Sequence, residues 1–275
     1  MMIVLTPIRE FKVPVLAECI SPDVFEGKNS AQIGQLLIYE GNREKKLQEL
    51  FKVEEAKTAE GIAEPAITIQ GDVSRIKYIG ARMTKGEIII NGSVGMHLGE
   101  EMKGGKITVH GNAGGWAGSA MKGGVIDIRG DAGDYLATPY RGSTQGMSGG
   151  KIIVHGNAGV DAGAYMRKGI IKVYGNAGQF AGMGMHDGMI YVKGNCDGRA
   201  GSCMTGGTIV ISGFIESILP SFTFDGLKKK VKIEESEVVE TPFYLFIGDL
   251  AENGKGKLYV SKTNNPQLSH YERFL

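Results

Sequence analysis

The chain of 275 residues is 42% hydrophobic and has a formal net charge of +1 at pH 7, from 31 basic and 30 acidic side chains. This balance gives no electrostatic footprint for nucleic acid or an anionic membrane, so neither is expected as a partner. The apolar run at the N-terminus is too short for a signal peptide or a membrane span, and a cytoplasmic location is therefore expected.

The first part of the chain, residues 1–65, precedes a repeated array and is predicted to be a flanking or cap region of strands and a short helix. In the segment that begins at Asn42, Leu47, Leu50 and Phe51 stand at helical spacing, which predicts a modest amphipathic helix. Some of this region must cap the array, because a bare terminal strand would expose unpaired backbone groups and core.

A sequence repeat occupies the middle of the chain. Copies of 19 residues start at Glu87, Lys106, Lys151, Ile170 and Met189. The copies at Ala66 and Val125 run to 21 and 26 residues, and an eighth strand opens at Thr208. Each copy begins with alternating inward and outward side chains, as in a half-buried strand. The first inward position is always isoleucine: Ile67, Ile88, Ile107, Ile126, Ile152, Ile171, Ile190 and Ile209.

A methionine column also follows the repeat, and we interpret it as core filler. Its members stand four residues before each next strand: Met83, Met102, Met121, Met147, Met166, Met185 and Met204. Identical residues at a fixed period indicate stacked rungs with like side chains in ladders about 4.8 Å apart, which is a parallel β-helix. Only one side of each rung is β-branched, which favours the right-handed, glycine-cornered type. We therefore predict a mainly β fold with a right-handed parallel β-helix of about seven coils in residues 66–213.

Glycines flank every strand, and we interpret them as structural corners. Those that follow the strands are Gly71, Gly92, Gly111, Gly130, Gly156, Gly175 and Gly194. Glycine lets the chain turn with positive φ or lets neighbouring rungs approach closely. A phosphate-binding loop needs one glycine-rich turn before a helix, whereas no helical pattern follows any of these copies, so nucleotide binding is not expected.

The last part of the chain, residues 214–275, is predicted to form strands that pack on or cap the array. Strand-like segments begin at Val231, Thr241 and Gly256. The outward column on the repeat strands is partly apolar and includes Ile89, Ile153, Tyr191 and Val210. We expect either the C-terminal segment or another protein chain to cover this column.

The residues indicate no catalytic, cofactor-binding or metal-ligating group. His110 and His155 share a column but would lie two rungs, about 9.6 Å, apart, too far to share a metal ion, so solvated histidines are expected. Cys19, Cys196 and Cys203 follow no recognised ligand spacing and predict free, mostly buried thiols. No nucleophile or acid–base grouping recurs, so an independent enzyme is not expected.

An outward column of large side chains predicts an interface with partners. It contains Tyr78, His97, Trp116, Asp161, Phe180 and Arg199. Such an aromatic stripe on a rigid face is typical of a protein–protein contact. The fourth copy also inserts an aromatic loop that bears Tyr135, Tyr140 and Arg141, and we expect this loop to dock into a neighbour; an ordinary solvated loop is the alternative.

The repeated GxxGxxxG pattern resembles the C-terminal β-helix domain of the glutamate synthase large subunit. It is complete in the copies that include Gly92, Gly111, Gly156 and Gly175, while Ser74, Thr144 and Asp197 stand where glycine is expected. With SPDVFEGKNSAQIGQL ahead of the array, essentially the whole chain resembles the C subunit of formylmethanofuran dehydrogenase.

The resemblance implies a cytoplasmic hetero-oligomer that reduces CO2 with methanofuran to formylmethanofuran, the first step of methanogenesis from CO2. It implies partner subunits with a tungsten or molybdenum pterin, iron–sulfur clusters and a metal-dependent amidohydrolase site, and no cofactor in this chain. A non-catalytic scaffold is therefore expected. The C subunit of a formyltransferase/hydrolase complex and the β-helix component of a multi-chain glutamate synthase remain as alternatives.

Overall fold

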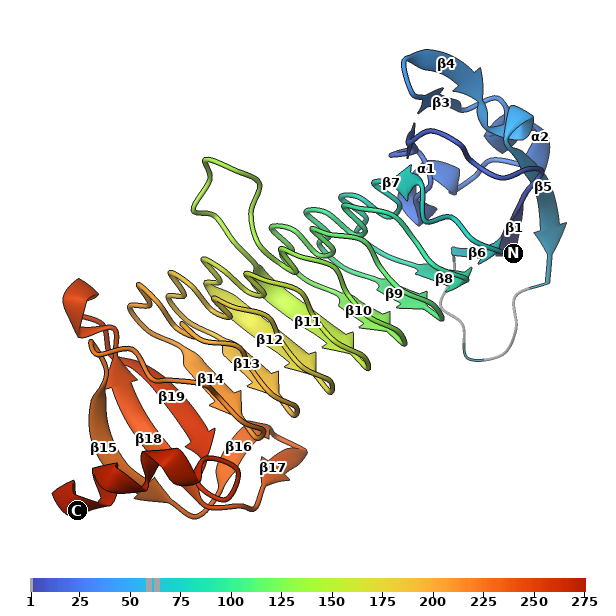
Figure 1. Cartoon of the computed structure of the whole chain (residues 1–275). Helices are drawn as coiled ribbons and strands as arrows, with labels where there is room; N and C mark the ends of the chain where they lie inside the picture. Colours follow the sequence, from blue (N-terminus) through green and yellow to red (C-terminus); the bar gives the residue numbers. More distant parts are fainter. Residues whose placement is uncertain (1, 58–60, 62–64) are drawn as a thin grey trace.

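The computed structural model describes residues 2–57, 61 and 65–275. The end of the predicted N-terminal region, residues 58–60 and 62–64, and residue 1 lie outside the described residues. The described part is mainly β structure and elongated, with the termini at opposite ends (Figure 1). Its main sheet has 13 strands in the order β15-β18-β19-β14-β13-β12-β11-β10-β9-β8-β6-β1-β5.

The repeat strands form the parallel centre of this sheet. They are β6 (Ala66–Gln70), β8 (Glu87–Asn91), β9 (Lys106–Val109), β10 (Val125–Ile128), β11 (Ser148–Val154), β12 (Lys168–Val173), β13 (Met189–Val192) and β14 (Thr208–Ile211). Each pairs with the next in the register of the sequence repeat, so that Ile67 lies opposite Ile88 and the isoleucine ladder continues to Ile209. We call one strand with the turns that lead to the next a rung.

A second line of parallel contacts joins the rungs away from the sheet. Isolated bridges connect Val73, Val94, Ala113, Ala132, Ala158, Ala177, Cys196 and Ile215 in sequence. Between the two lines lies the core, in which the isoleucine and methionine columns are fully buried. A single rung could not bury these side chains alone. Hydrophobic stabilisation of the core therefore requires that the rungs stack on one another.

Two kinds of glycine shape the turns. Gly105, which precedes a strand, has φ +80°, a conformation that L side chains rarely adopt. Of the predicted corner glycines, Gly71 also has a positive φ, of +101°. The other six need space instead: a Cβ would come within 2.1–2.7 Å of the preceding rung at Gly92, Gly111, Gly130, Gly156, Gly175 and Gly194.

Polar side chains beside these glycines tie one rung to the next. The Oδ1 atom of Asn112 accepts a hydrogen bond of 2.9 Å from the backbone N–H of Asp131, and Asp131 accepts one of 2.7 Å from Asn157. The pattern continues through Asn157, Asn176 and Asn195. This ladder satisfies turn N–H groups that would otherwise need water, since each such group requires a partner.

The N-terminal end closes the array with one parallel and one antiparallel strand. β1 (Met2–Pro7) continues the parallel stack onto β6, and β5 (Phe51–Ala56) pairs with β1 in the antiparallel sense. A small sheet stands beside it, formed by β2 (Val15–Leu16), β3 (Leu37–Glu40), β4 (Arg43–Lys46) and β7 (Ile76–Lys77). Two short helices, α1 (Pro22–Phe25) and α2 (Ser30–Gly34), lie between these strands, and Asn29 with Gln32 forms a capping box at the start of α2.

The predicted helix from Asn42 is wrong. That segment forms β4, a single 3-10 turn η1 (Leu47–Glu49) and β5. Gly41, at φ +59°, turns the chain from β3 into β4, so a hairpin forms where a helix was expected. Leu47, Leu50 and Phe51 are all buried. Their spacing therefore reflects burial on a 3-10 turn and a strand, and not the apolar face of a helix.

The C-terminal end is closed in a similar way. β19 (Gly256–Ser261) adds to β14 in parallel, and β18 (Phe243–Gly248) and β15 (Thr223–Lys228) follow in the antiparallel sense. Two 3-10 segments, η2 (Leu250–Glu252) and η3 (Pro266–Phe274), complete this end. The strands predicted from Val231, Thr241 and Gly256 are confirmed. Among the described residues, no helix has the length and apolar character needed to cross a bilayer.

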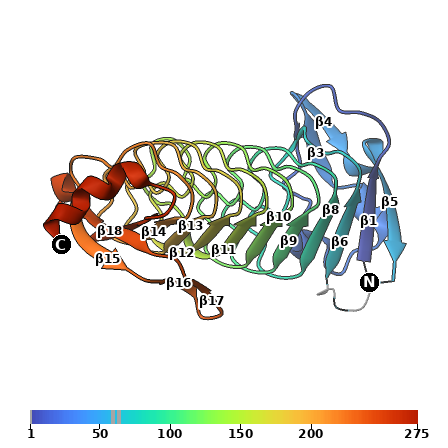
Figure 2. The same cartoon turned by 60° about the horizontal axis from the view of Figure 1, so that its bottom comes forward.

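A C-terminal hairpin covers part of the outward strand column. It consists of β16 (Val231–Glu234) and β17 (Glu237–Val239) and lies below β12 to β14 in Figure 2. Val231 and Ile233 pack on Tyr191 and Val210 in a small second core. Ile89 and Ile153 of the same column remain half-buried.

Ion pairs hold this hairpin in place. The ammonium of Lys172, on β12, is buried between the carboxylates of Glu234 and Glu237, and Lys151 pairs with Glu234 as well. The side chain of Lys172 is only 4% exposed. Because a buried ammonium needs compensating charge, the hairpin and β12 depend on each other.

Replacing Gly111 by Ala should destabilise the array, because its Cβ would lie 2.7 Å from the backbone of Gly92. We expect a loss of about 3 kcal/mol or more in the free energy of unfolding, measured by urea denaturation. Gly198→Ala is the matched control, since its nearest neighbours lie 3.8 Å away and its φ is ordinary. Equal stability of the two variants would contradict the close approach of the rungs.

Glu234→Gln should destabilise the protein at pH 7 by about 1–2 kcal/mol, because the buried ammonium of Lys172 keeps only the half-buried Glu237 as an anionic partner. Hydrogen bonds from Lys151 and then Lys172 lower the pKa of Glu234. A carboxyl group whose pKa is lower in the folded than in the unfolded state stabilises the fold at pH values above its unfolded-state pKa. This contribution is lost as the pH falls through its folded-state pKa. The difference between variant and parent should therefore shrink below about pH 4, whereas Glu235→Gln, at an exposed neighbour, should change little at any pH.

Candidate functional site

A stack of aromatic rings runs along the array on the side of the turns. The ring centroids of Tyr78 and His97 lie 4.6 Å apart, those of His97 and Trp116 5.4 Å, and those of Trp116 and Tyr135 4.4 Å. The interplanar angles are 19°, 5° and 20°, so the four rings are stacked. We call this column of residues, which continues through Asp161, Phe180 and Arg199, the aromatic column.

An unusual backbone conformation produces this alignment. All seven members have positive φ, between 59° and 68°, although none is glycine. Each such residue costs roughly 1 kcal/mol or more, and it persists only where the surroundings hold it. Rung-to-rung hydrogen bonds do so here: the backbone N–H of His97 donates to Gly115 over 3.0 Å, and that of Trp116 donates to Asp134 over 2.9 Å.

The insertion of the fourth repeat copy folds back onto this column. Residues 138–146 leave the array as the long loop that projects in Figure 1 and re-enter it before β11. Tyr140 is 58% exposed, and its ring centroid is 6.0 Å from those of both His97 and Trp116. Thr138 and Pro139 at the base are buried. The loop therefore extends the aromatic surface and presents Arg141 at its tip.

His97 is the most enclosed ring of the aromatic column. It is 5% exposed, between Tyr78 and Trp116, although the sequence placed it on an outward face. Its Nδ1 lies 2.8 Å from Oε2 of Glu100, but the two atoms are not aligned for a good hydrogen bond. Stacking between Tyr78 and Trp116 holds the histidine in contact with the rings of Trp116 and Tyr140.

The residues predicted as an interface are only partly brought together. Trp116 contacts both Tyr135 and Tyr140, and Tyr78 begins the same stack. Phe180 lies two levels beyond Tyr135 and carries the guanidinium of Arg199 over its ring at 5.2 Å. Sequence reasoning assigned Tyr135 to the insertion alone and missed its place in the aromatic column. The signal was present, since Tyr135 follows Ala132 by the same three residues that separate Trp116 from Ala113.

A polar cluster that the sequence did not indicate lies at the end of the strands. His155 Nε2 is 2.9 Å from Oδ1 of Asp127, and Arg129 is 3.0 Å from the other oxygen of that carboxylate. No group of three or more His, Cys, Asp or Glu side chains suited to a metal ion occurs within the described ranges. The cluster joins Asp127 on β10 to Arg129 and His155, which directly follow β10 and β11.

The cysteines are free, with one buried, one half-buried and one exposed. Burial, with a smaller effect of the Asp197 charge, raises the pKa of Cys196 to about 12. Burial also raises the pKa of Cys19 to about 11. Neither thiol is therefore a ready nucleophile at neutral pH. Cys203 is exposed, contrary to the expectation of mostly buried thiols.

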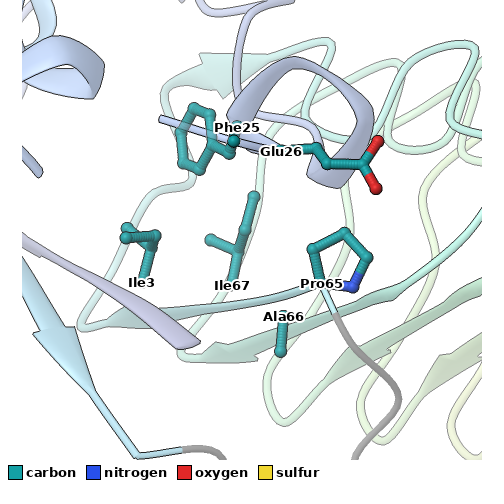
Figure 3. Close-up of a pocket in the computed structure, with 7 residues that line it drawn as sticks. Ile3, Phe25, Glu26, Pro65, Ala66 and Ile67 are labelled. Carbon is teal, nitrogen blue, oxygen red and sulfur yellow. The ribbon is translucent and has the colours of Figure 1, made fainter. Parts of the chain in front are cut away.

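A cavity of about 310 Å³ lies at the junction of the N-terminal end and the first rung (Figure 3). Ile3 from β1, Phe25 from α1 and Ile67 from β6 line it, with Pro65 at one edge and the carboxylate of Glu26 turned toward the outside. Its walls are mainly apolar and bring no two reactive groups together. It is a gap in the packing of the N-terminal end, and none of the residues that line it belongs to the aromatic column.

Comparison with known proteins gives close relatives for part of the chain. A segment is 46% identical over 95 residues to the C subunit of the molybdenum-containing formylmethanofuran dehydrogenase 1 of Methanothermobacter thermautotrophicus, covering 34% of this chain and 23% of that protein. A match of 96 residues is 45% identical to the C subunit of the tungsten-containing formylmethanofuran dehydrogenase 2 of the same organism, covering 35% of each chain. The matched segments thus span about a third or less of these relatives. No protein-family model matches the sequence.

A solved structure covers nearly the whole chain. The X-ray crystal structure of the formyltransferase/hydrolase complex (FhcABCD) from Methylorubrum extorquens, in complex with methylofuran, contains a chain that superposes with a TM-score of 0.84. The two chains are 30% identical, and the superposition covers 94% of this chain and 99% of that one.

Tyr140→Ala should expose the single tryptophan of the chain, Trp116, to water and shift its fluorescence emission to longer wavelength by several nanometres. The reason is the tilted contact of the two rings at 6.0 Å. Tyr39→Ala, at an exposed tyrosine of the N-terminal sheet, should leave the emission unchanged. An unshifted emission maximum in Tyr140→Ala would show that the loop does not rest on the aromatic column in solution.

Proposed function

Since the chain belongs to the family of formylmethanofuran dehydrogenase C subunits, we propose that it is the C subunit of a tungsten or molybdenum formylmethanofuran dehydrogenase and serves as its non-catalytic scaffold. This cytoplasmic complex reduces CO2 with methanofuran to formylmethanofuran. The observation that carries the proposal is an array of rungs bonded along two lines, with an aromatic column and a loop on one side.

The architecture that we infer for this scaffold has three parts. Residues 1–65 form an N-terminal cap, residues 66–213 a right-handed parallel β-helix of about seven coils with 19-residue repeats, and residues 214–275 a C-terminal cap. The in-register pairing of the repeat strands and the second line of bridges support this division. A stack of this kind resists bending, because every rung is bonded to its neighbours along two lines.

The partners that we propose are the catalytic subunits of the complex. The redox subunits carry the tungsten or molybdenum pterin and iron–sulfur clusters, and another subunit resembles metal-dependent amidohydrolases. The names of the relatives, which include molybdenum- and tungsten-containing enzymes, support a metal in the assembly. Tyr78, Trp116, Phe180, Tyr135, Tyr140 and Arg141 are the proposed contacts, with the glycines of the turns holding them in place.

A second candidate is the C subunit of a formyltransferase/hydrolase complex. The superposition with a chain of the Methylorubrum extorquens complex over nearly the full length favours it. In that case the same scaffold would hold an amidohydrolase-like subunit without a redox partner. Metal content separates the two, because only the dehydrogenase carries tungsten or molybdenum.

The test is co-purification of the tagged native protein from its own cells, followed by mass spectrometry and metal analysis. If the chain is the scaffold of a dehydrogenase, an amidohydrolase-like chain should co-purify together with tungsten or molybdenum. If it belongs to a hydrolase complex, an amidohydrolase-like chain should co-purify without either metal.

A double variant, Tyr140→Ser with Arg141→Ser, should reduce the yield of partner chains at least about tenfold, since large aromatic and arginine side chains dominate interface energies. Tyr39→Ser with Arg43→Ser is the matched control, because it removes another exposed tyrosine and arginine. Unchanged yield in the first variant, or an equal loss in both, would contradict a contact through the loop.

A further inference from the structure

One level of the aromatic column carries a carboxylate in place of a ring. Asp161 follows Tyr135 and precedes Phe180, with the same left-handed backbone at φ 60°. Rungs lie about 4.8 Å apart, close to the ring spacing in the stack. A planar group placed over Asp161 would therefore continue the stack between Tyr135 and Phe180.

A cavity of about 270 Å³ opens at this level, between the aromatic column and the inserted loop. Its lining includes Trp116, Tyr135, Tyr140, Tyr165 and Met183 together with Asp161, and Arg141 from the loop also lines it. Aromatic faces carry negative charge density, and a carboxylate at the base adds to it. The chemistry of the walls therefore favours a cation with a flat, weakly hydrated surface.

The charge of Asp161 is not balanced within the described chain. Its carboxylate has no ion pair or hydrogen bond with any described residue. Asp134, on the preceding rung, accepts a backbone hydrogen bond from Val160 but also lacks a cationic partner among the described residues. Burial, and then the charge of Asp134, raises the pKa of Asp161. Both effects would be offset by a positive group in the cavity.

The aromatic column already shows how such a group can bind. Next along it, the guanidinium of Arg199 lies over the ring of Phe180 at 5.2 Å. A guanidinium is planar and stacks on rings while donating to a carboxylate, whereas the ammonium of lysine is compact and strongly hydrated. Arginine therefore fits this cavity better than lysine does.

We propose that the cavity over Asp161 binds an arginine side chain of a partner protein, with the guanidinium stacked on Tyr135 and paired with the carboxylate. This inference rests on the proposed function, because the arginine comes from a chain that the scaffold holds. It deepens that function by naming the chemistry of one contact.

Arg141 is the competitor within the chain itself. It lines the same cavity but is exposed at the loop tip beside Gly142, and it does not pair with Asp161. Its charge would repel an incoming guanidinium. Arg141→Gln should therefore strengthen binding of an arginine probe about two- to threefold, and a loss of binding in this variant would overturn the assignment of the cavity to an external cation.

The first measurement uses the full chain and the fluorescence of Trp116, which lines the cavity. The probe is acetyl-Gly-Arg-Gly-amide, compared with the same peptide containing citrulline, which has the shape of arginine without its charge. We expect a saturable change at roughly millimolar arginine peptide, and binding at least about tenfold weaker for citrulline. No saturable response, or equal responses to both peptides, would overturn the inference.

Variants locate the binding. Asp161→Asn should weaken binding of the arginine peptide at least about tenfold. Asp131→Asn is the matched control, because it removes a nearby carboxylate from a ladder position that other rungs fill with asparagine, and it should bind as the parent does. Equal weakening in both variants would show general charge attraction and overturn a site at Asp161.

The source of the arginine is tested in the assembled complex. Asp161→Asn should lower the yield of co-purified catalytic subunits several-fold, and Asp131→Asn should not. If the peptide binds but the yield in Asp161→Asn is unchanged, the partner origin of the arginine is overturned. If the parent chain retains no catalytic subunits while the peptide still binds, the proposed function fails and the cation site stands, so the two failures are distinguishable.

Discussion

The backbone register between successive rungs is the constraint on which the rest of this protein depends. Each repeat strand pairs with the next at the same position, from Ile67 to Ile209, and the turns are joined by a second line of bridges. The close approach of the rungs leaves no room for a Cβ at Gly111 and its equivalents. A fixed period therefore determines which positions face the core, which turn, and which project outward.

The aromatic column follows from the same register. Its residues stand at one turn position of the repeat. Hydrogen bonds from their backbone N–H groups to the next rung hold all of them except Arg199 in a left-handed conformation that the side chain alone would disfavour. Rings placed one rung apart then stack without further adjustment, as Trp116 and Tyr135 do. The backbone of the array thus fixes where these side chains lie. The residue type at this one position of each repeat determines whether the group there is a ring, a carboxylate or a guanidinium.

The sequence was sufficient for features that recur and insufficient for those that occur once. The isoleucine ladder, the methionine column and the strands near the C-terminus could be predicted, because repetition or alternation marked them. The helix from Asn42 could not be excluded, since Leu47, Leu50 and Phe51 are apolar in either conformation and only the hairpin turn at Gly41 and pairing with β1 decide the outcome. The burial of His97 also escaped prediction, because it depends on a loop that folds back from 43 residues later, at Tyr140. Long-range contacts of this kind leave no periodic trace.

The strands at the two ends of the main sheet limit the number of rungs and so fix the length of the array. Antiparallel strands β5 and β15 terminate the stack, and charged side chains such as Lys52 and Glu54 on β5 discourage another chain from extending it. The number of rungs between each end and the inserted loop is therefore fixed, at about 4.8 Å for each. Insertion or deletion of one whole repeat would move the loop along the array by one rung spacing and would preserve the pattern of contacts between the remaining rungs. The length of the array is thus determined by the number of repeat copies, most of which have 19 residues, and the position of the loop is determined by the number of rungs on each side of it.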